Sequence, residues 1–116
     1  MRDSISDKVR LLHIIDAIND IETYFSSDTG ILTADKISRL ACVKLFEIIG
    51  EAAYNITKET KEKYNEVPWK ELSGMRHILV HEYYDVDFSI IQQIIQTDIP
   101  KLKNSINKIL IELKNE

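Results

Sequence analysis

A regular run of apolar residues near the end of the chain constrains the fold more than any other feature. Its members are three or four positions apart: Phe88, Ile91, Ile95, Ile99, Leu102, Ile106, Ile109 and Leu113. This spacing places them all on one face of an α-helix more than three heptads long. Pro100 lies inside the run, and the apolar stripe keeps its phase across it. The sequence therefore predicts one long helix that is kinked near Thr97 to Ile99.

Two earlier segments show the same helical spacing and could cover that apolar face. The first is predicted over Ser6 to Phe25, where Ser4 and Asp7 resemble an N-terminal capping box. Thr33 is predicted to cap the second helix. The apolar stripe predicted for this second helix consists of Ile37, Ala41, Leu45, Ile48, Ala52 and Ile56.

The remaining segments are shorter. Residues 57–66 are polar and predict a solvated helical turn or loop, and Pro68 stands where a short helix would begin, with Trp69 as its core anchor. Asp85 and Asp87 are candidate caps for the last helix. Three glycines, two prolines and no period-two alternation argue against strands. The predicted fold is a single all-α domain over residues 1–116, a bundle of four to five helices.

Charge and cysteine content narrow the possible functions. The net charge of −4 disfavours a protein that coats nucleic acid, but it leaves room for one local cationic site. Cys42, the only cysteine, is expected to be a buried and unreactive thiol. Neither an apolar leader nor a membrane-spanning run is found, so a cytoplasmic location without membrane contact is expected.

The stretch "GMRHILVHEYYD", residues 74–85, concentrates titratable side chains. His77 and His81 are four residues apart, which places them on one helix face, but Ile78 stands where zinc proteases of that spacing carry a glutamate. The sequence has no Cys/His cluster to supply a third ligand, so neither a metal nor another cofactor is predicted. Ser73-Gly74, just before these histidines, could interrupt or kink the helix.

Phosphodiester chemistry fits the same stretch better. On a helix, Arg76, His81 and Tyr83 can border one groove. A guanidinium binds phosphate through paired hydrogen bonds, and an imidazole can exchange the proton of a ribose hydroxyl. Cleavage by the 2′-hydroxyl needs both a base and an acid, which a two-fold dimer would supply from two copies of His81. On the residues alone, a solvated polar helix face remains the alternative.

Gly50 and Glu51 in the second helix are the other candidates. Gly50 suggests a close helix–helix approach, which would allow Glu51 to reach Arg76 and hold its guanidinium. An exposed glutamate paired with Lys44 or Lys58 is the equal alternative. His77 is expected to orient or border the site, and His13 is expected at the surface.

The pattern R-x-x-x-x-H-x-Y, met by Arg76, His81 and Tyr83, resembles the HepT-like branch of the HEPN superfamily. His77 provides the polar residue that HEPN proteins tend to place after the arginine. The resemblance covers nearly the whole chain through three blocks in the expected order. These blocks are "FEIIGEAAYNIT" (residues 46–57), "VPWKELSGMRHILVHEYYDVD" (residues 67–87) and "DIPKLKNSINKIL" (residues 98–110).

The resemblance implies a HEPN-type bundle that forms a homodimer with both motifs at a shared cleft. It implies the toxin of a type VII-like toxin–antitoxin pair, a metal-independent endoribonuclease acting on messenger or transfer RNA with Arg76 and His81 as catalytic residues. The implied partner is an MntA-like minimal nucleotidyltransferase antitoxin that transfers AMP to Tyr83. The alternative is a non-catalytic binding or regulatory partner of a nucleotidyltransferase.

Overall fold

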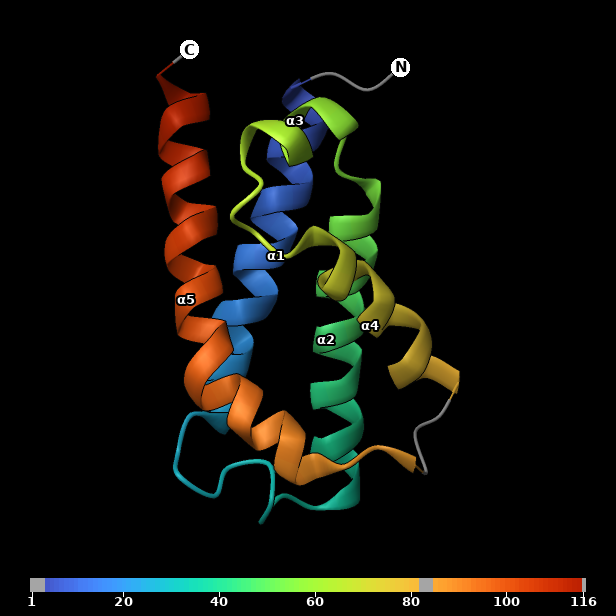
Figure 1. Ribbon diagram of the computed structural model, residues 1–116. Helices are drawn as coiled ribbons and strands as arrows, with labels where there is room; N and C mark the ends of the chain where they lie inside the picture. Colours follow the sequence, from blue (N-terminus) through green and yellow to red (C-terminus); the bar gives the residue numbers. More distant parts are fainter. Residues whose placement is uncertain (1–3, 82–84, 116) are drawn as a thin grey trace.

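The structure, a computed structural model, describes the backbone of residues 4–81 and 85–115 and the side chains of residues 7–76 and 85–115. Within these ranges all regular secondary structure is helical (Figure 1). The α-helices are α1 (Ser4–Phe25), α2 (Lys36–Asn55), α3 (Lys58–Lys63), α4 (Trp69–His81) and α5 (Phe88–Lys114). The predicted all-α bundle of four to five helices is confirmed.

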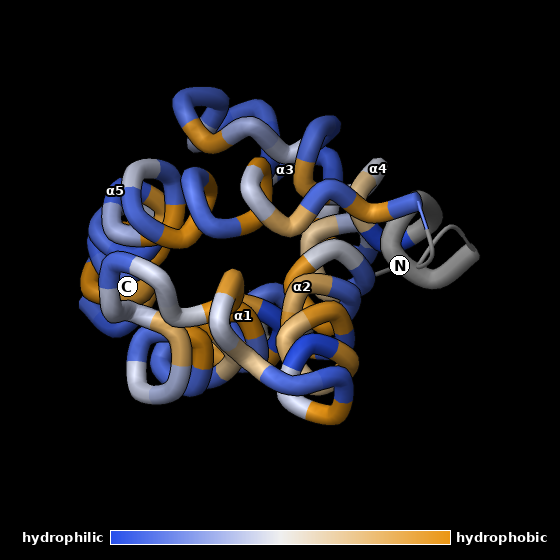
Figure 2. Tube along the Cα trace, turned by 90° about the horizontal axis from the view of Figure 1, so that it is seen from below, coloured by the Kyte–Doolittle hydropathy of each residue, from blue (hydrophilic) through white to orange (hydrophobic). Residues whose placement is uncertain are grey.

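Helix α1 packs against both α2 and α5, and α4 packs against α2 on the other side. Figure 2 shows hydrophobic and hydrophilic residues interspersed along the longer helices, as amphipathic helices require, whereas α3 contains only hydrophilic residues. The most buried side chains come from α1, α2 and α5. They include Leu11, Ile14, Ile18, Ile21, Ile49, Ile106 and Ile109. The core therefore lies mainly between these three helices, and Ile31 together with Trp69 and Leu72 of α4 belongs to the same buried cluster.

Helix α5 is continuous through Pro100, as the unbroken apolar stripe predicted. Figure 1 shows that it changes direction between its orange first part and its red second part. Proline has no N–H to donate to the carbonyl of Gln96, and its ring crowds that carbonyl, which bends the helix. Ile99 and Leu102 are buried on either side of the bend, so the kink keeps the apolar face on the core.

The buried face of α2 differs from the predicted one. Ile37 is 73% exposed, and Leu45 and Ile48 are only partly buried. The side that packs inward consists of Cys42, Val43, Phe46, Ile49, Gly50, Ala52 and Ala53. The predicted stripe was right at Ala52 and Ile56, which are buried, but wrong at its start. Helix α2 carries two overlapping apolar faces, and contact with α1 on one side and α4 on the other selects the second of them.

The cap of α2 is also a correction. Asp35, not Thr33, is its N-cap, and its Oδ1 accepts a hydrogen bond from the backbone N–H of Ser38 at 2.7 Å. That bond holds the pKa of Asp35 below its usual value. Thr33 instead donates its hydroxyl to the carbonyl of Thr29 at 2.9 Å. Asp87 caps α5 as predicted, accepting from the N–H of Ser89 at 2.9 Å.

Asp7 has a different role from the one that the capping box predicted. It is 1% exposed, and its carboxylate accepts a hydrogen bond from the backbone N–H of Thr57 at 3.0 Å. It also accepts from the hydroxyls of Thr57 and Thr60. Because Thr57 is the N-cap of α3, one buried carboxylate fixes that short helix to α1.

The segment from α3 to α4 follows its prediction closely. The polar residues form the short helix α3, and Trp69 is 6% exposed, as expected of a core anchor. Its indole N–H donates to the carbonyl of Tyr64 at 3.0 Å. Helix α4 runs through Ser73 and Gly74 without the interruption that these residues suggested.

Candidate functional site

The close approach of α4 to α2 fixes the position of Arg76. A Cβ atom added at Gly50 would lie 2.8 Å from the carbonyl oxygen of Leu72 and 2.9 Å from the backbone nitrogen of Arg76. No real Cβ contact is that short, so only glycine allows the two helices to lie this near each other. The predicted close helix–helix approach at Gly50 is confirmed. The backbone of Arg76 lies at this point of contact, so the side chain of Arg76 extends from there.

Two side chains of α2 hold the guanidinium of Arg76. Nη1 of Arg76 donates to Oε2 of Glu51 at 3.3 Å, and Cζ of Arg76 lies 3.6 Å from the centre of the Tyr54 ring. A carboxylate on one side and an aromatic face on the other restrict both the direction and the plane of the guanidinium. The side chain of Arg76 is 26% exposed, so it is held in place but still open to solvent.

Glu51 makes the contact that the sequence suggested. Its Oε1 accepts a hydrogen bond from Nδ2 of Asn55 at 3.2 Å, while its other oxygen receives Arg76. The alternative partners bind elsewhere, since Lys44 pairs with Glu47 at 3.4 Å and Lys58 pairs with Glu62 at 3.9 Å. The orienting role assigned to Glu51 stays a prediction, now with a defined geometry.

Sequence reasoning missed Tyr54. It lies four residues after Gly50 and three after Glu51, hence on the same side of α2, and this spacing was the available signal. Tyrosines on a helix are usually half-buried packing residues, so the spacing did not stand out. The ring is 52% exposed, and the guanidinium covers one part of it.

The structure describes only part of the other residues of the predicted site. The backbones of His77 and His81 belong to α4, which extends five residues beyond Arg76, but their side chains lie outside the described residues. Tyr83 and the neighbouring Tyr84 also lie outside them. The grouping of Arg76, His81 and Tyr83 around one groove therefore stays a prediction.

Cys42 is not available as a nucleophile. It is fully buried in α2, and desolvation raises its pKa to about 12, so the thiol stays protonated.

Among the described residues, no group of three His, Cys, Asp or Glu side chains could hold a metal ion. None of the helices, within the same described ranges, is long and apolar enough to cross a membrane. His13 is exposed, as predicted.

Comparison with known proteins identifies relatives of the chain. The family model described as "Ribonuclease HepT-like" matches residues 14–109. A protein of Methanocaldococcus jannaschii named "Gamma-glutamylcyclotransferase and putative RNase" is 42% identical over 107 residues, which are 91% of this chain and 48% of the relative. The chain thus spans about half the length of that relative.

Two further relatives are closer to this chain in length. A "Putative RNase" of the same organism is 35% identical over 100 residues, 85% of this chain and 92% of the relative. A "Probable ribonuclease HepT" of Thermococcus cleftensis is 39% identical over 75 residues, 65% of this chain and 68% of the relative. No solved structure matches the chain significantly.

The matched range contains both α2 and α4 and the R-x-x-x-x-H-x-Y motif that begins at Arg76. It thereby confirms the family that the three sequence blocks indicated. The chain belongs to the ribonuclease HepT-like family.

Proposed function

We propose that this protein is the toxin of a toxin–antitoxin pair and acts as a metal-independent endoribonuclease. One observation supports this most directly: Arg76 is held between Glu51 and Tyr54 and remains open to solvent. A guanidinium fixed before the substrate arrives loses little entropy on binding, and this favours catalysis by charge stabilisation. The family to which the chain belongs supports RNA as the substrate.

In the proposed reaction, Arg76 binds the phosphate that is cleaved. Among the described residues, Glu51 takes one of the five N–H donors of the guanidinium, which leaves donors for two phosphate oxygens. Negative charge grows on those oxygens as the fifth bond to phosphorus forms. The arginine therefore stabilises the transition state more than the bound substrate.

His81 provides the proton transfer, and a homodimer provides the second imidazole. One imidazole accepts the proton of the ribose 2′-hydroxyl as its oxygen bonds to phosphorus. The imidazolium of the other subunit donates a proton to the 5′-oxygen as the bond between that oxygen and phosphorus breaks. The products are a 2′,3′-cyclic phosphate and a 5′-hydroxyl, and no metal is required.

The proposed partner is a minimal nucleotidyltransferase antitoxin. It would transfer AMP from ATP to the hydroxyl of Tyr83, with pyrophosphate as the leaving group. Tyr83 lies two residues after His81, so the added phosphate would compete with RNA for Arg76 and obstruct the groove. Intact mass of protein co-expressed with the antitoxin tests this step, with Tyr83→Phe and the adjacent Tyr84→Phe as a matched pair.

The decisive experiment is RNA cleavage by the purified protein in EDTA. We expect Arg76→Ala and His81→Ala each to reduce cleavage by about a thousandfold, the range seen when one stabilising or proton-transferring group is removed. Lys70→Gln, which removes an exposed cation of the same helix, serves as the charge-matched control. Cleavage that persists in the His81→Ala protein would rule out the mechanism. A stable complex with a nucleotidyltransferase, and no cleavage by the wild type, would instead support a non-catalytic partner.

A further inference from the structure

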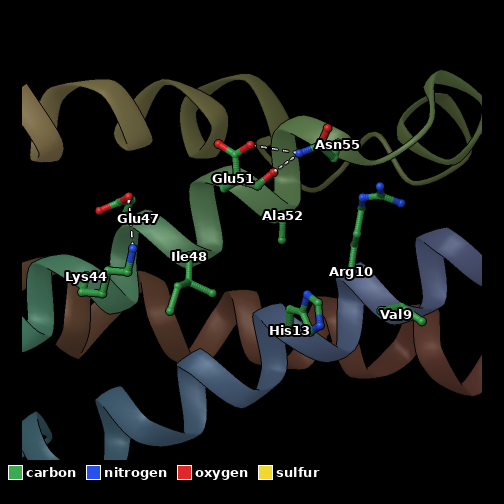
Figure 3. Close-up of a pocket in the computed structure, with 9 residues that line it drawn as sticks. All are labelled: Val9, Arg10, His13, Lys44, Glu47, Ile48, Glu51, Ala52 and Asn55. Carbon is green, nitrogen blue, oxygen red and sulfur yellow. Dashed lines mark hydrogen bonds and ion pairs between the residues drawn. The ribbon is translucent and has the colours of Figure 1, made fainter.

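A second feature adjoins the site, an open groove of about 470 Å³ between α1 and α2 (Figure 3). Three of its lining side chains, Arg10, His13 and Lys44, are basic. Val9 and Ile48 provide an apolar surface between the two helices, and Val9 is 46% exposed. The groove therefore combines basic groups with an apolar wall, although the whole chain is acidic.

Two carboxylates, Glu47 and Glu51, line the groove beside its basic groups, and both have cationic partners. Lys44 is paired with Glu47, and Glu51 is paired with Arg76. Within the part of the chain that the structure describes, Arg10 and His13 make neither an ion pair nor a side-chain hydrogen bond. They are three residues apart on α1 and so share one face of it. In Figure 3 both side chains extend from α1 on the side of the groove.

Glu51 is the residue that links the groove to Arg76. It belongs to the wall of the groove and is also the residue that binds the guanidinium. Figure 3 shows the carboxylate of Glu51 directed toward the helix above the groove, while Arg10 and His13 extend from the opposite wall. An RNA strand bound at Arg76 would have to cross α2 at Glu51 to reach Arg10 and His13.

We propose that Arg10 and His13 form a phosphate subsite that holds the RNA strand beside the phosphodiester bound at Arg76. The arginine binds the phosphate oxygens through its paired N–H groups, and the imidazole adds a further hydrogen bond. Val9 and Ile48 contact the adjoining ribose or base. The subsite rests on the proposed function, and it explains how an acidic chain could bind RNA through a few local cations.

The test measures binding separately from cleavage. A single-stranded RNA oligonucleotide with 2′-O-methyl groups throughout cannot be cleaved by 2′-hydroxyl attack, and its binding can be followed by fluorescence anisotropy. We expect Arg10→Gln to weaken binding about tenfold and to lower the salt slope by about 0.7, the value for one phosphate of a single strand. His13→Gln should weaken binding less, because it removes one neutral or singly charged donor.

Controls identify other causes of a change. Lys108→Gln removes an exposed cation of α5 and should leave the Kd within about twofold of the wild type. Thermal unfolding and light scattering of each variant report on folding and on subunit association. A second arm measures the binding of ATP, by its competition with the labelled RNA in the anisotropy assay, because a free nucleotide offers the same phosphate chemistry.

The outcomes separate this subsite from the nuclease mechanism. Binding of RNA that is unchanged in both Arg10→Gln and His13→Gln overturns the subsite, whether or not the wild type cleaves RNA. A loss of ATP binding without a loss of RNA binding also overturns it, as does a changed oligomeric state with unchanged affinity. Dependence of RNA binding on Arg10 in a protein that does not cleave RNA supports the subsite and rejects the proposed function alone.

Discussion

Two carboxylates join helices in this molecule, and they do so in opposite environments. Asp7 is 1% exposed and accepts hydrogen bonds from Thr57 and Thr60, which ties α1 to α3. The side chain of Glu51 is 59% exposed and accepts one hydrogen bond from Arg76, which ties α2 to α4. Both contacts connect residues far apart in the sequence, so each could be considered a structural link.

Their partners show why the two contacts differ in purpose. The donors around Asp7 are a backbone N–H and two hydroxyls, groups that are costly to bury without an acceptor. The partner of Glu51 is a guanidinium that is still partly exposed, where water could replace the carboxylate at little cost. The first contact maintains the fold, and we propose that the second positions a group that acts on RNA.

Removal of the buried carboxylate should have the largest effect on stability. Asp7→Ala leaves one N–H and two hydroxyls without their acceptor, and we expect the free energy of unfolding to fall by about 3 kcal/mol. Urea denaturation measures this change, and Asp16→Ala, at an exposed aspartate of the same helix, is the matched control. Cleavage per folded molecule should stay near that of the wild type. An unchanged unfolding free energy in Asp7→Ala would mean that the contacts of Asp7 do not maintain the fold.

The helices themselves could be predicted from the sequence, because apolar periodicity determines where an amphipathic helix lies. The stripe from Phe88 to Leu113 identified α5 and its bend at Pro100 correctly. The buried face of α2 could not be predicted in the same way. Its two overlapping apolar faces satisfy the same periodicity, and only the positions of α1 and α4 decide between them.

The candidate site was predictable to the extent that local rules apply. Gly50 indicated a close approach, and that approach brings Glu51 to Arg76. The Asp7 network and the stacking of Tyr54 on Arg76 depend on how helices far apart in the sequence are aligned with each other. Periodicity within one helix contains no information about that alignment.

A change at Gly50 tests whether the functional contact depends on the distance between two helices. The Cβ of Gly50→Ala would overlap backbone atoms of Leu72 and Arg76, which must shift. Alanine favours the helix by about 1 kcal/mol, but the overlap should dominate and lower the unfolding free energy by about 2 kcal/mol net. Because α4 moves away from Glu51, we expect cleavage to fall further than the folded fraction does.

Gly74 provides the matched control for that experiment. Among the described residues, an added Cβ there would have no neighbour within 4 Å, so Gly74→Ala should stabilise the protein by up to about 1 kcal/mol through helix propensity alone. Thermal unfolding followed by circular dichroism measures both variants. Equal stabilisation of both would mean that α2 and α4 can separate freely, and then the position of Arg76 would not depend on Gly50.

The smallest effect is expected at Glu51, where function and stability should separate most clearly. Glu51→Ala should change the unfolding free energy by less than about 0.5 kcal/mol, because its contact with Arg76 is exposed. Turnover should fall about tenfold as Arg76 loses its fixed direction, whereas Glu51→Gln keeps an acceptor and should retain most activity. Glu47→Ala, one turn away and paired with Lys44, is the control. A rise in turnover for Glu51→Ala would mean that this carboxylate competes with phosphate for the guanidinium, and the residue would then restrain the site that it was expected to support.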